Sequence, residues 1–289
     1  MRQFCNKHSS CFKSVLSLYH IAFMLRQQDP RLITVGDKIY IVYSNMIQGQ
    51  DTLETRRVFV AELTHDGNEF RVGEPECLSK FEGENEQRWQ KNWTPFDYKG
   101  ELHLAYSFLP HRILKPIFGT NSCETVASTI SNIDWQWGVL RGGTHAQLEG
   151  DEYLGFFHSS IEMKTAHSDG EKIQHYFMGA YTFLAHPPFT ITRISPKPIV
   201  GKNFYHGPAH KTWKPLRVVF PGGYISTKKY IWVVYGRQDH ETWVAKIDKK
   251  NATYNVIFGE RSNGKTYALL QKGVRDYLKD GSQMAYVRR

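Results

Sequence analysis

The sequence is poor in cysteine and lacks long hydrophobic runs, and both absences exclude classes of protein. The four cysteines, Cys5, Cys11, Cys77 and Cys123, are irregularly spaced and include no CxxC pair. This pattern argues against a disulfide scaffold or a zinc ribbon and predicts free thiols in the reducing environment of the cytoplasm. The apolar stretch 14–25 is too short for a membrane span of about 20 residues, and no small-x-small cleavage site follows it. We therefore expect neither a membrane segment nor a secretory signal.

Acidic residues are scarce relative to basic ones. Lys and Arg total 37 against 28 Asp and Glu, which gives the 289-residue chain a formal net charge of +9. The aromatic content of 14% is that of a folded globular protein rather than a disordered chain. The basic surplus suits anionic ligands. Nucleic acid is one such ligand, but the basic segment Lys265–Lys279 carries no nucleic-acid motif, and we expect no nucleic acid to bind.

The sequence does contain a repeat, in which a polar turn precedes an alternating run of aromatic and β-branched residues. The four copies cover residues 36–44, 100–107, 150–159 and 228–236. Each copy predicts a turn that leads into a buried strand. The copies begin 64, 50 and 78 positions apart. This spacing fits the blades of a β-propeller, with a β-sandwich as the rival architecture.

A second motif lies just upstream of each copy. The four segments are Asp29-Pro30-Arg31, Lys91-Asn92-Trp93, Arg141-Gly142-Gly143-Thr144 and Phe220-Pro221-Gly222-Gly223. Their offset from the repeats suits a short strand that enters a hairpin turn, so each unit is predicted to read motif, strand, turn, strand. In a propeller the first strand of each blade lines a central funnel. The four segments would then meet at one mouth, although they are far apart in the sequence.

These segments resemble motifs of glycoside hydrolase family 130, the five-bladed propeller enzymes that include β-mannoside phosphorylases, and of the related protozoan mannosyltransferase/phosphorylases. The first three segments are similar to the family's Glu-Asp-Pro-Arg, Glu-Lys-Asn and glycine-rich turn. Phe157-His158-Ser159 is similar to its aromatic-His-Gly strand end. Val219–Gly223, followed by Tyr235-Gly236 and Asp239, stands in the place of its Phe-Pro-Cys-Gly and Tyr-Gly-x-x-Asp. Two positions depart from the pattern, because Gln28 and Gln90 stand where the family has acidic residues.

The resemblance implies an all-β, five-bladed β-propeller, four of whose blades are visible in the sequence. Residues 29–250 would form the propeller with its central sugar-binding funnel. Residues 1–28 are an N-terminal segment and a candidate part of the closing blade, and residues 251–289 close or flank the propeller. The implied activity is that of a glycosyltransferase, phosphorylase or glycosidase acting on mannosides, and in particular the transfer of a mannosyl-type residue between a glycoside and phosphate.

An inverting phosphorylase needs only one carboxylic acid, because phosphate itself is the nucleophile and cationic groups hold it in line. The resemblance assigns the acid role to Asp29, acting through a sugar hydroxyl. The residues expected to bind substrate are Arg31, Asn45, Lys91, Asn92, Arg141, His158 and Asp239. An oligosaccharide or sugar phosphate would be the substrate, inorganic phosphate or a sugar phosphate the co-substrate, and no cofactor would be needed. We expect no metal, because Gly207-Pro208 between His206 and His210 argues against a shared helical face.

Each candidate also has an ordinary structural interpretation. An Asp before a proline, as at Asp29, is a common turn opener. Lys91 taken alone is a typical solvated lysine, and Arg141 could cap a β-turn. His158 ends an apolar strand, where a histidine often hydrogen-bonds within the fold. The functional interpretation is favoured only because these residues occur together with the other motifs.

Two other functions stay open at this stage. A propeller with the same funnel could bind sugars without turnover, as the glutamines at 28 and 90 suggest. A hydrolase of the same fold would need a second carboxylate to activate water, and Glu84, Glu86 and Asp239 are the candidates by motif context. The sugar, its linkage, the direction of the reaction and the oligomeric state do not follow from the sequence.

Overall fold

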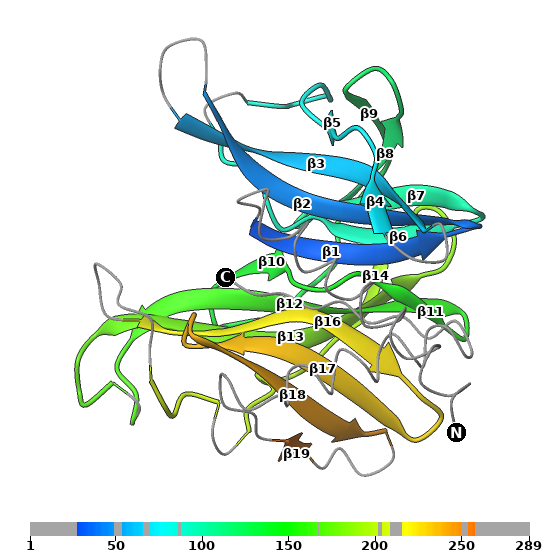
Figure 1. Cartoon of the computed structure of the whole chain (residues 1–289). Helices are drawn as coiled ribbons and strands as arrows, with labels where there is room; N and C mark the ends of the chain where they lie inside the picture. The colour runs from blue at the N-terminus through cyan, green and yellow to red at the C-terminus, as the bar shows by residue number, and fades with distance from the viewer. Residues whose placement is uncertain are drawn as a thin grey trace, which may run out of the picture.

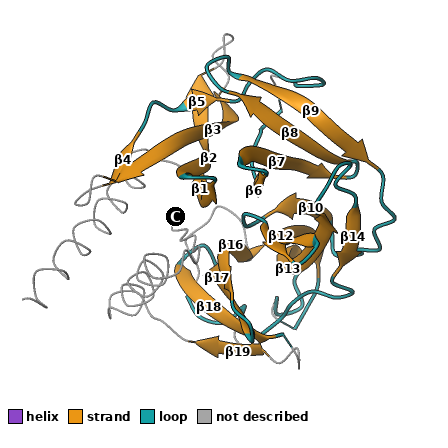
Figure 2. Cartoon of the chain, turned by 90° about the vertical axis from the view of Figure 1, so that its right-hand side faces the viewer, coloured by secondary structure: helices purple, strands orange, loops and turns teal. Residues whose placement is uncertain are grey.

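A computed structural model describes residues 28–48, 54–65, 70–85, 88–166, 168–201, 204–208, 216–249 and 254–257. The regular structure of these residues consists of β-strands in four sheets. Figure 1 shows two of the sheets above the other two, and the perpendicular view of Figure 2 shows the four sheets arranged around a common centre. The all-β prediction is therefore confirmed, with a propeller-like arrangement of four blades.

The first two blades are built from consecutive antiparallel strands. Blade 1 contains, in sheet order, β1 (Gln28–Val35), β2 (Lys38–Gln48), β3 (Glu54–His65) and β4 (Phe70–Val72), with β5 (Glu76–Cys77) also paired to β3. Blade 2 contains β6 (Thr94–Tyr98), β7 (Glu101–Phe108), β8 (His111–Ile117) and β9 (Ser122–Thr129). In both blades the sheet order follows the chain order from the centre outwards, as the strand labels in Figure 2 show.

The other two blades follow the same plan with small additions. Blade 3 contains β10 (Val139–Gly142), β12 (Glu152–Met163), β13 (Ile173–Leu184) and β14 (Ile191–Ile194), with β11 (Gln147–Glu149) on β12 and β15 (Leu216–Arg217) parallel to β13. Blade 4 contains β16 (Val219–Ser226), β17 (Tyr230–Arg237), β18 (Glu241–Asp248) and β19 (Tyr254–Ile257).

All four repeats form the predicted hairpins. The turns join β1 to β2, β6 to β7, β11 to β12 and β16 to β17, and each second strand is the run that the repeat marks. The first three turns contain Gly36, Gly100 and Gly150, whose φ angles are 59°, 79° and 70°. This left-handed conformation is inexpensive only for glycine. The polar turn with its glycine was therefore a reliable marker of the hairpin.

The hydrophobic cores lie between neighbouring blades. The cluster between blades 1 and 2 includes Val42, Val60, Leu104 and Leu114. The cluster between blades 2 and 3 includes Phe96, Phe157, Tyr181 and Phe183, and the one between blades 3 and 4 includes Phe156, Met178, Tyr224 and Val233. Each fully buried aliphatic or aromatic side chain contributes roughly 1.5–3 kcal/mol. This packing fixes each blade against the next and so fixes the ends of the innermost strands.

Several smaller predictions can also be compared with the structure. Cys77 and Cys123 are free thiols, as predicted, and Cys5 and Cys11 lie outside the described residues. Within the part of the chain that the structure describes, no helix has the length and apolar character needed to cross a membrane.

Candidate functional site

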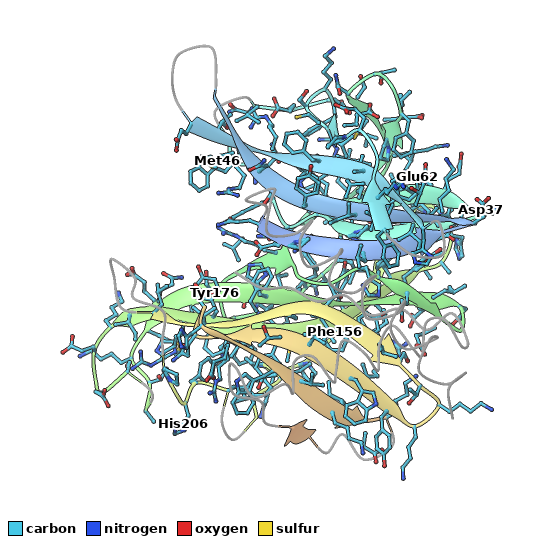
Figure 3. All side chains as sticks on the ribbon, viewed as in Figure 1. Asp37, Met46, Glu62, Phe156, Tyr176 and His206 are labelled. Atoms are coloured by element: carbon cyan, nitrogen blue, oxygen red, sulfur yellow. The ribbon has the colours of Figure 1, made fainter. Side chains whose placement is uncertain are left out.

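The innermost strands all begin at the same end of the propeller, which we call the mouth. In blade 1, Gln28 pairs with Ser44, so the start of β1 lies beside the end of β2. Figure 3 shows Asp37 and Glu62 at one end of this blade and Met46 at the opposite end, which is the mouth. The other blades pair their hairpins in the same sense. The motif segments therefore reach the mouth from four different blades.

Arg31 joins three of these segments. Its side chain is 2% exposed, and its Nε donates to the carbonyl of Gly143 at 2.6 Å, while Nη1 donates to the carbonyl of Asp29 at 2.8 Å. Nη2 donates to Asn92 Oδ1 at 3.4 Å and to the carbonyl of Gly142 at 3.3 Å. Blades 1, 2 and 3 thus meet on one guanidinium group. Burial lowers the pKa of Arg31 to about 10, against the opposing effect of the Asp29 charge.

The two glycines of blade 3 permit this approach. A Cβ atom at Gly142 would lie 2.2 Å from the carbonyl oxygen of Asn92, and one at Gly143 would lie 2.7 Å from Pro221 Cγ. Neither distance is possible for a real side chain, so both positions require glycine. Because Pro221 belongs to β16, the fourth blade also reaches this point. The predicted convergence of the four motif segments is therefore found in the structure.

Asp29 and Asn92 have unusual backbone conformations. Their φ angles are 53° and 63°, in the left-handed region. Asp29 also lies in a β-bulge, because the β1–β2 register shifts between Gln28 and Arg31. Asn and Asp tolerate this conformation better than most residues, but it still costs on the order of 1 kcal/mol and is concentrated at functional sites. A bulge re-aims side chains at the edge of a sheet, and here it occurs at the proposed acid.

A layer of buried polar groups lies around Arg31. Burial, with a smaller effect of the Arg31 charge, lowers the pKa of His145 to about 4. Its ring stacks on that of Tyr224, with centroids 5.1 Å apart. Burial also raises the pKa of Tyr181, while Thr94 and Arg31 oppose this shift. These groups are therefore a neutral histidine and a neutral tyrosine beside a cationic arginine.

Arg141 and His158 are cross-strand neighbours in blade 3. They pair directly between β10 and β12, with Arg141 exposed and His158 buried. The imidazole of His158 lies 4.6 Å from the ring of Phe220 and 6.1 Å from that of Tyr176, measured between centroids. The structure thus places the two predicted residues side by side, although only the arginine reaches solvent.

The other predicted residues also lie towards the mouth. Lys91 is half-buried and directly precedes Asn92. Asn45 is half-buried on β2 opposite Arg57, and its Oδ1 accepts a hydrogen bond from the backbone N–H of Met46 at 2.9 Å. Asp239 is in the β17–β18 hairpin, half-buried, with a φ of 50°.

The Asp239 hairpin rests on a buried ion pair. Arg237 Nη2 donates to Glu241 Oε2, and both side chains are almost fully buried. The guanidinium also lies 3.7 Å from the ring centroid of Trp243, whose Nε1 donates to Glu241 Oε2 at 2.8 Å. Such a buried, hydrogen-bonded pair holds its surroundings in one geometry. The Asp239 backbone is thereby held at the mouth edge of blade 4.

Sequence reasoning passed over several residues that the structure places in this region. His145 and Thr94 directly follow recognised motif segments, and their position there was the available signal. Trp93 is almost fully buried and packs against Phe81 and Tyr106, in keeping with the packing role that aromatic residues usually have in propellers.

Comparison with solved structures identifies the fold. The chain superposes on MPT-1, a GDP-Man-dependent mannosyltransferase from Leishmania mexicana, with a TM-score of 0.53 and 14% identity, covering 80% of this chain and 72% of the other. It superposes on MPT-4, a mannose phosphorylase from the same organism, with a TM-score of 0.53 and 12% identity, covering 80% and 71%. This chain shares their fold. The resemblance to family 130-like propellers is therefore confirmed at the level of architecture.

Sequence comparison gives a shorter match. A segment of 60 residues is 40% identical to Beta-mannosyltransferase 2 of Komagataella phaffii, and it spans 20% of this chain and 9% of the length of that curated relative. No family model matches the chain. This chain thus shares its fold with MPT-1 and MPT-4 and one short similar segment with Beta-mannosyltransferase 2.

Proposed function

We propose that this chain is a carbohydrate-active enzyme that transfers a mannosyl-type residue between a glycoside and a phosphate or sugar phosphate. The observation that carries the proposal is the meeting of the Asp29, Asn92 and Gly142-Gly143 segments on the guanidinium of Arg31 at the mouth of the propeller. The names of the structural neighbours and of the short sequence match support the same class of substrate.

In the proposed reaction Asp29 is the proton donor. A phosphate oxygen forms a bond to the anomeric carbon while the bond from that carbon to the leaving sugar oxygen breaks, and the proton of Asp29 passes through a sugar hydroxyl to that leaving oxygen. One carboxylic acid suffices because the phosphate supplies the electron pair. The reaction consumes only the glycoside and phosphate, so it needs neither a cofactor nor a metal.

The remaining predicted residues divide into two groups in this proposal. Lys91 and Arg141 supply cationic groups for phosphate, of which the exposed Arg141 offers the bidentate geometry that phosphate favours, and the buried His158 supports Arg141 from the neighbouring strand β12. Asn45, Asn92 and Asp239 hydrogen-bond sugar hydroxyls. The sequence-based prediction assigns Arg31 to substrate, but its guanidinium donates hydrogen bonds to four acceptors of the protein itself. It therefore acts on substrate through Asp29 and Asn92, as a positioning residue.

The decisive experiment compares Asp29→Asn with Asp37→Asn. Both variants exchange a carboxylate for an amide in the same hairpin, but Asp37 is exposed in the turn at the end opposite the mouth. Purified protein is supplied with mannose 1-phosphate or GDP-mannose and a panel of manno-oligosaccharide acceptors, and released phosphate or GDP is measured. We expect Asp29→Asn to lower the rate at least 100-fold and Asp37→Asn to leave it unchanged. Equal rates in the two variants would remove Asp29 from the acid role.

The same assay distinguishes the alternatives. Free mannose released from an oligosaccharide without phosphate would identify a hydrolase. For that reaction Glu84 is out of reach of water, because its carboxylate lies 3.5 Å from the guanidinium of Arg57 and both side chains are buried. Glu86 lies outside the described residues, so Glu86 and Asp239 both stay candidates for that base. Sugar binding without turnover in any arm would identify a binding propeller.

We also infer a fifth blade between blades 4 and 1. Blade 1 carries a second apolar cluster, Ile41, Tyr43, Ala61 and Leu63, on the face turned away from blade 2. Among the described residues, all members of this cluster belong to blade 1 itself. An apolar face of this kind needs a partner layer, and a closing blade between blades 4 and 1 would supply one. A crystal structure with four blades and no fifth sheet beside Tyr43 would refute this inference.

A further inference from the structure

The segment that leads into β6 holds one tryptophan out towards solvent. Arg57 Nη1 donates to the carbonyl of Arg88 at 3.0 Å, and the N–H of Gln90 donates to the carbonyl of Arg56 at 2.9 Å. Trp89 lies between these two anchors, and its side chain is 52% exposed. Its neighbours Gln90, Asn92 and Trp93 are buried. The exposure of Trp89 is therefore a feature of a segment that is fixed on both sides.

The indole of Trp89 is also supported from blade 1. The guanidinium of Arg56 lies 5.4 Å from the centroid of the indole ring, in cation–π contact. Arg56 is itself buried, so the ring rests on a group that the fold holds in place. A large aromatic side chain that is exposed yet held in one orientation is typical of a binding surface.

Trp89 lies on the mouth side of the propeller, close to the proposed acid. Its partner Arg56 is on β3 and pairs with Met46 of β2. Two positions back along β2, Ser44 pairs with Gln28 of β1, the residue that precedes Asp29. Arg56 is therefore two strands away from Asp29, a distance on the order of 10 Å. The same segment continues directly into Lys91 and Asn92. A sugar unit bound at Asp29 would not cover Trp89, but a longer saccharide would.

We propose that Trp89 is the stacking platform of an acceptor subsite, which binds a pyranose ring of an oligosaccharide beyond the unit that reacts at Asp29. This inference rests on the proposed function and names the substrate class for the outer part of the same site. One face of a pyranose ring presents mainly C–H groups, and these pack against an indole face, while ring hydroxyls remain available to polar groups. Arg56 supports the indole and sets its orientation. The subsite therefore selects oligosaccharides over monosaccharide phosphates.

The test compares Trp89→Ala, Trp89→Phe and Phe118→Ala. Phe118 is the matched control, because it is also an exposed aromatic residue, 49% exposed, and stacks on Tyr40 with ring centroids 5.5 Å apart. Binding of manno-oligosaccharides of increasing length, and of mannose 1-phosphate, is measured by calorimetry. Trp89→Ala should weaken binding of the longer oligosaccharides about tenfold, Trp89→Phe should weaken it less, and Phe118→Ala should not change it. Binding of mannose 1-phosphate should be equal in all four proteins.

Each result bears on a separate part of the reasoning. If the wild-type chain binds no saccharide, the proposed function fails and this inference with it. If the wild type binds oligosaccharides and Trp89→Ala binds them equally well, the subsite is refuted and the proposed function stands. If Trp89→Ala does not fold, oxidation of the wild type with N-bromosuccinimide, followed by peptide mass spectrometry, answers the question. Oligosaccharide should protect Trp89 from oxidation and mannose 1-phosphate should not, and equal oxidation in both would refute the subsite.

Discussion

Replacement of Arg31 by methionine should destabilise the propeller by about 3 kcal/mol. The change removes donors from four acceptors, of which the carbonyls of Gly143 and Asp29 are bound at 2.6 and 2.8 Å and the other two at more than 3.2 Å. A buried acceptor without its partner costs about 1–3 kcal/mol, so the two short bonds account for about 5 kcal/mol and the two long ones for about 1. Methionine carries no charge, so its burial avoids the cost of removing a charged group from water. The lowering of the Arg31 pKa to about 10 corresponds to about 3 kcal/mol of that cost. This gain offsets half of the loss of about 6 kcal/mol and leaves a net loss of about 3 kcal/mol.

Urea unfolding followed by tryptophan fluorescence measures this difference, provided that the dependence on urea concentration is the same in both proteins. The control is Arg193→Met, which removes a guanidinium from an ion pair with Glu152 in which the arginine side chain is 74% exposed. Exposed ion pairs contribute less than about 1 kcal/mol. If Arg31→Met and Arg193→Met lose equal and small amounts of stability, Arg31 does not hold the blades together at the mouth.

Two further predictions concern packing and protonation. Gly143→Ala should lower the free energy of unfolding by about 1–3 kcal/mol, because the new Cβ would lie 2.7 Å from Pro221 Cγ. The control is Gly236→Ala, in which the nearest neighbour of the new Cβ would be 3.9 Å away. This variant should unfold at the same urea concentration as the wild type. Burial lowers the pKa of His111 and of His145 to about 4, so both are neutral when folded and bind protons on unfolding below pH 6.5. Stability should be complete above that pH and fall by about 2 kcal/mol per histidine at pH 5, as thermal unfolding at pH 7 and pH 5 would measure. His111→Asn and His145→Asn should each weaken this dependence, and a melting temperature that does not change between the two pH values would refute the argument.

The sequence was sufficient for the hairpins because their signals are local. In the first copy, Gly36 permits the turn conformation and the apolar run Ile39–Tyr43 marks a strand that is buried on both faces. Both features act within a few residues of each other. The same holds for the copies that begin at Gly100 and Gly150. The convergence of the motif segments also followed, because equivalent strands in a propeller begin at the same mouth.

The contacts within the site could not be read in the same way. The role of Arg31 depends on which carbonyls of blades 2 and 3 come within reach, and this is set by the packing between blades rather than by the neighbours of Arg31 in the sequence. Trp89 looks no different in the sequence from the buried Trp93. Only the anchors provided by Arg56 and Arg57, more than 30 positions upstream, distinguish the two.

Left-handed backbone occurs at both ends of the innermost strands of blades 1 and 2. At the turn end of β1 and β6, Gly36 and Gly100 adopt it at little cost, and Lys99 adopts it beside Gly100 with a φ of 55°. At the mouth end, Asp29 and Asn92 adopt it with their side chains retained, although glycine would relieve the strain. Asn92 Oδ1 accepts a hydrogen bond from Arg31, which gives that side chain a role in the fold. Arg31 meets Asp29 at its backbone carbonyl instead, so this contact does not require a carboxylate at position 29. We therefore expect the bulge and the strained backbone of Asp29 to serve the direction in which its carboxylate points.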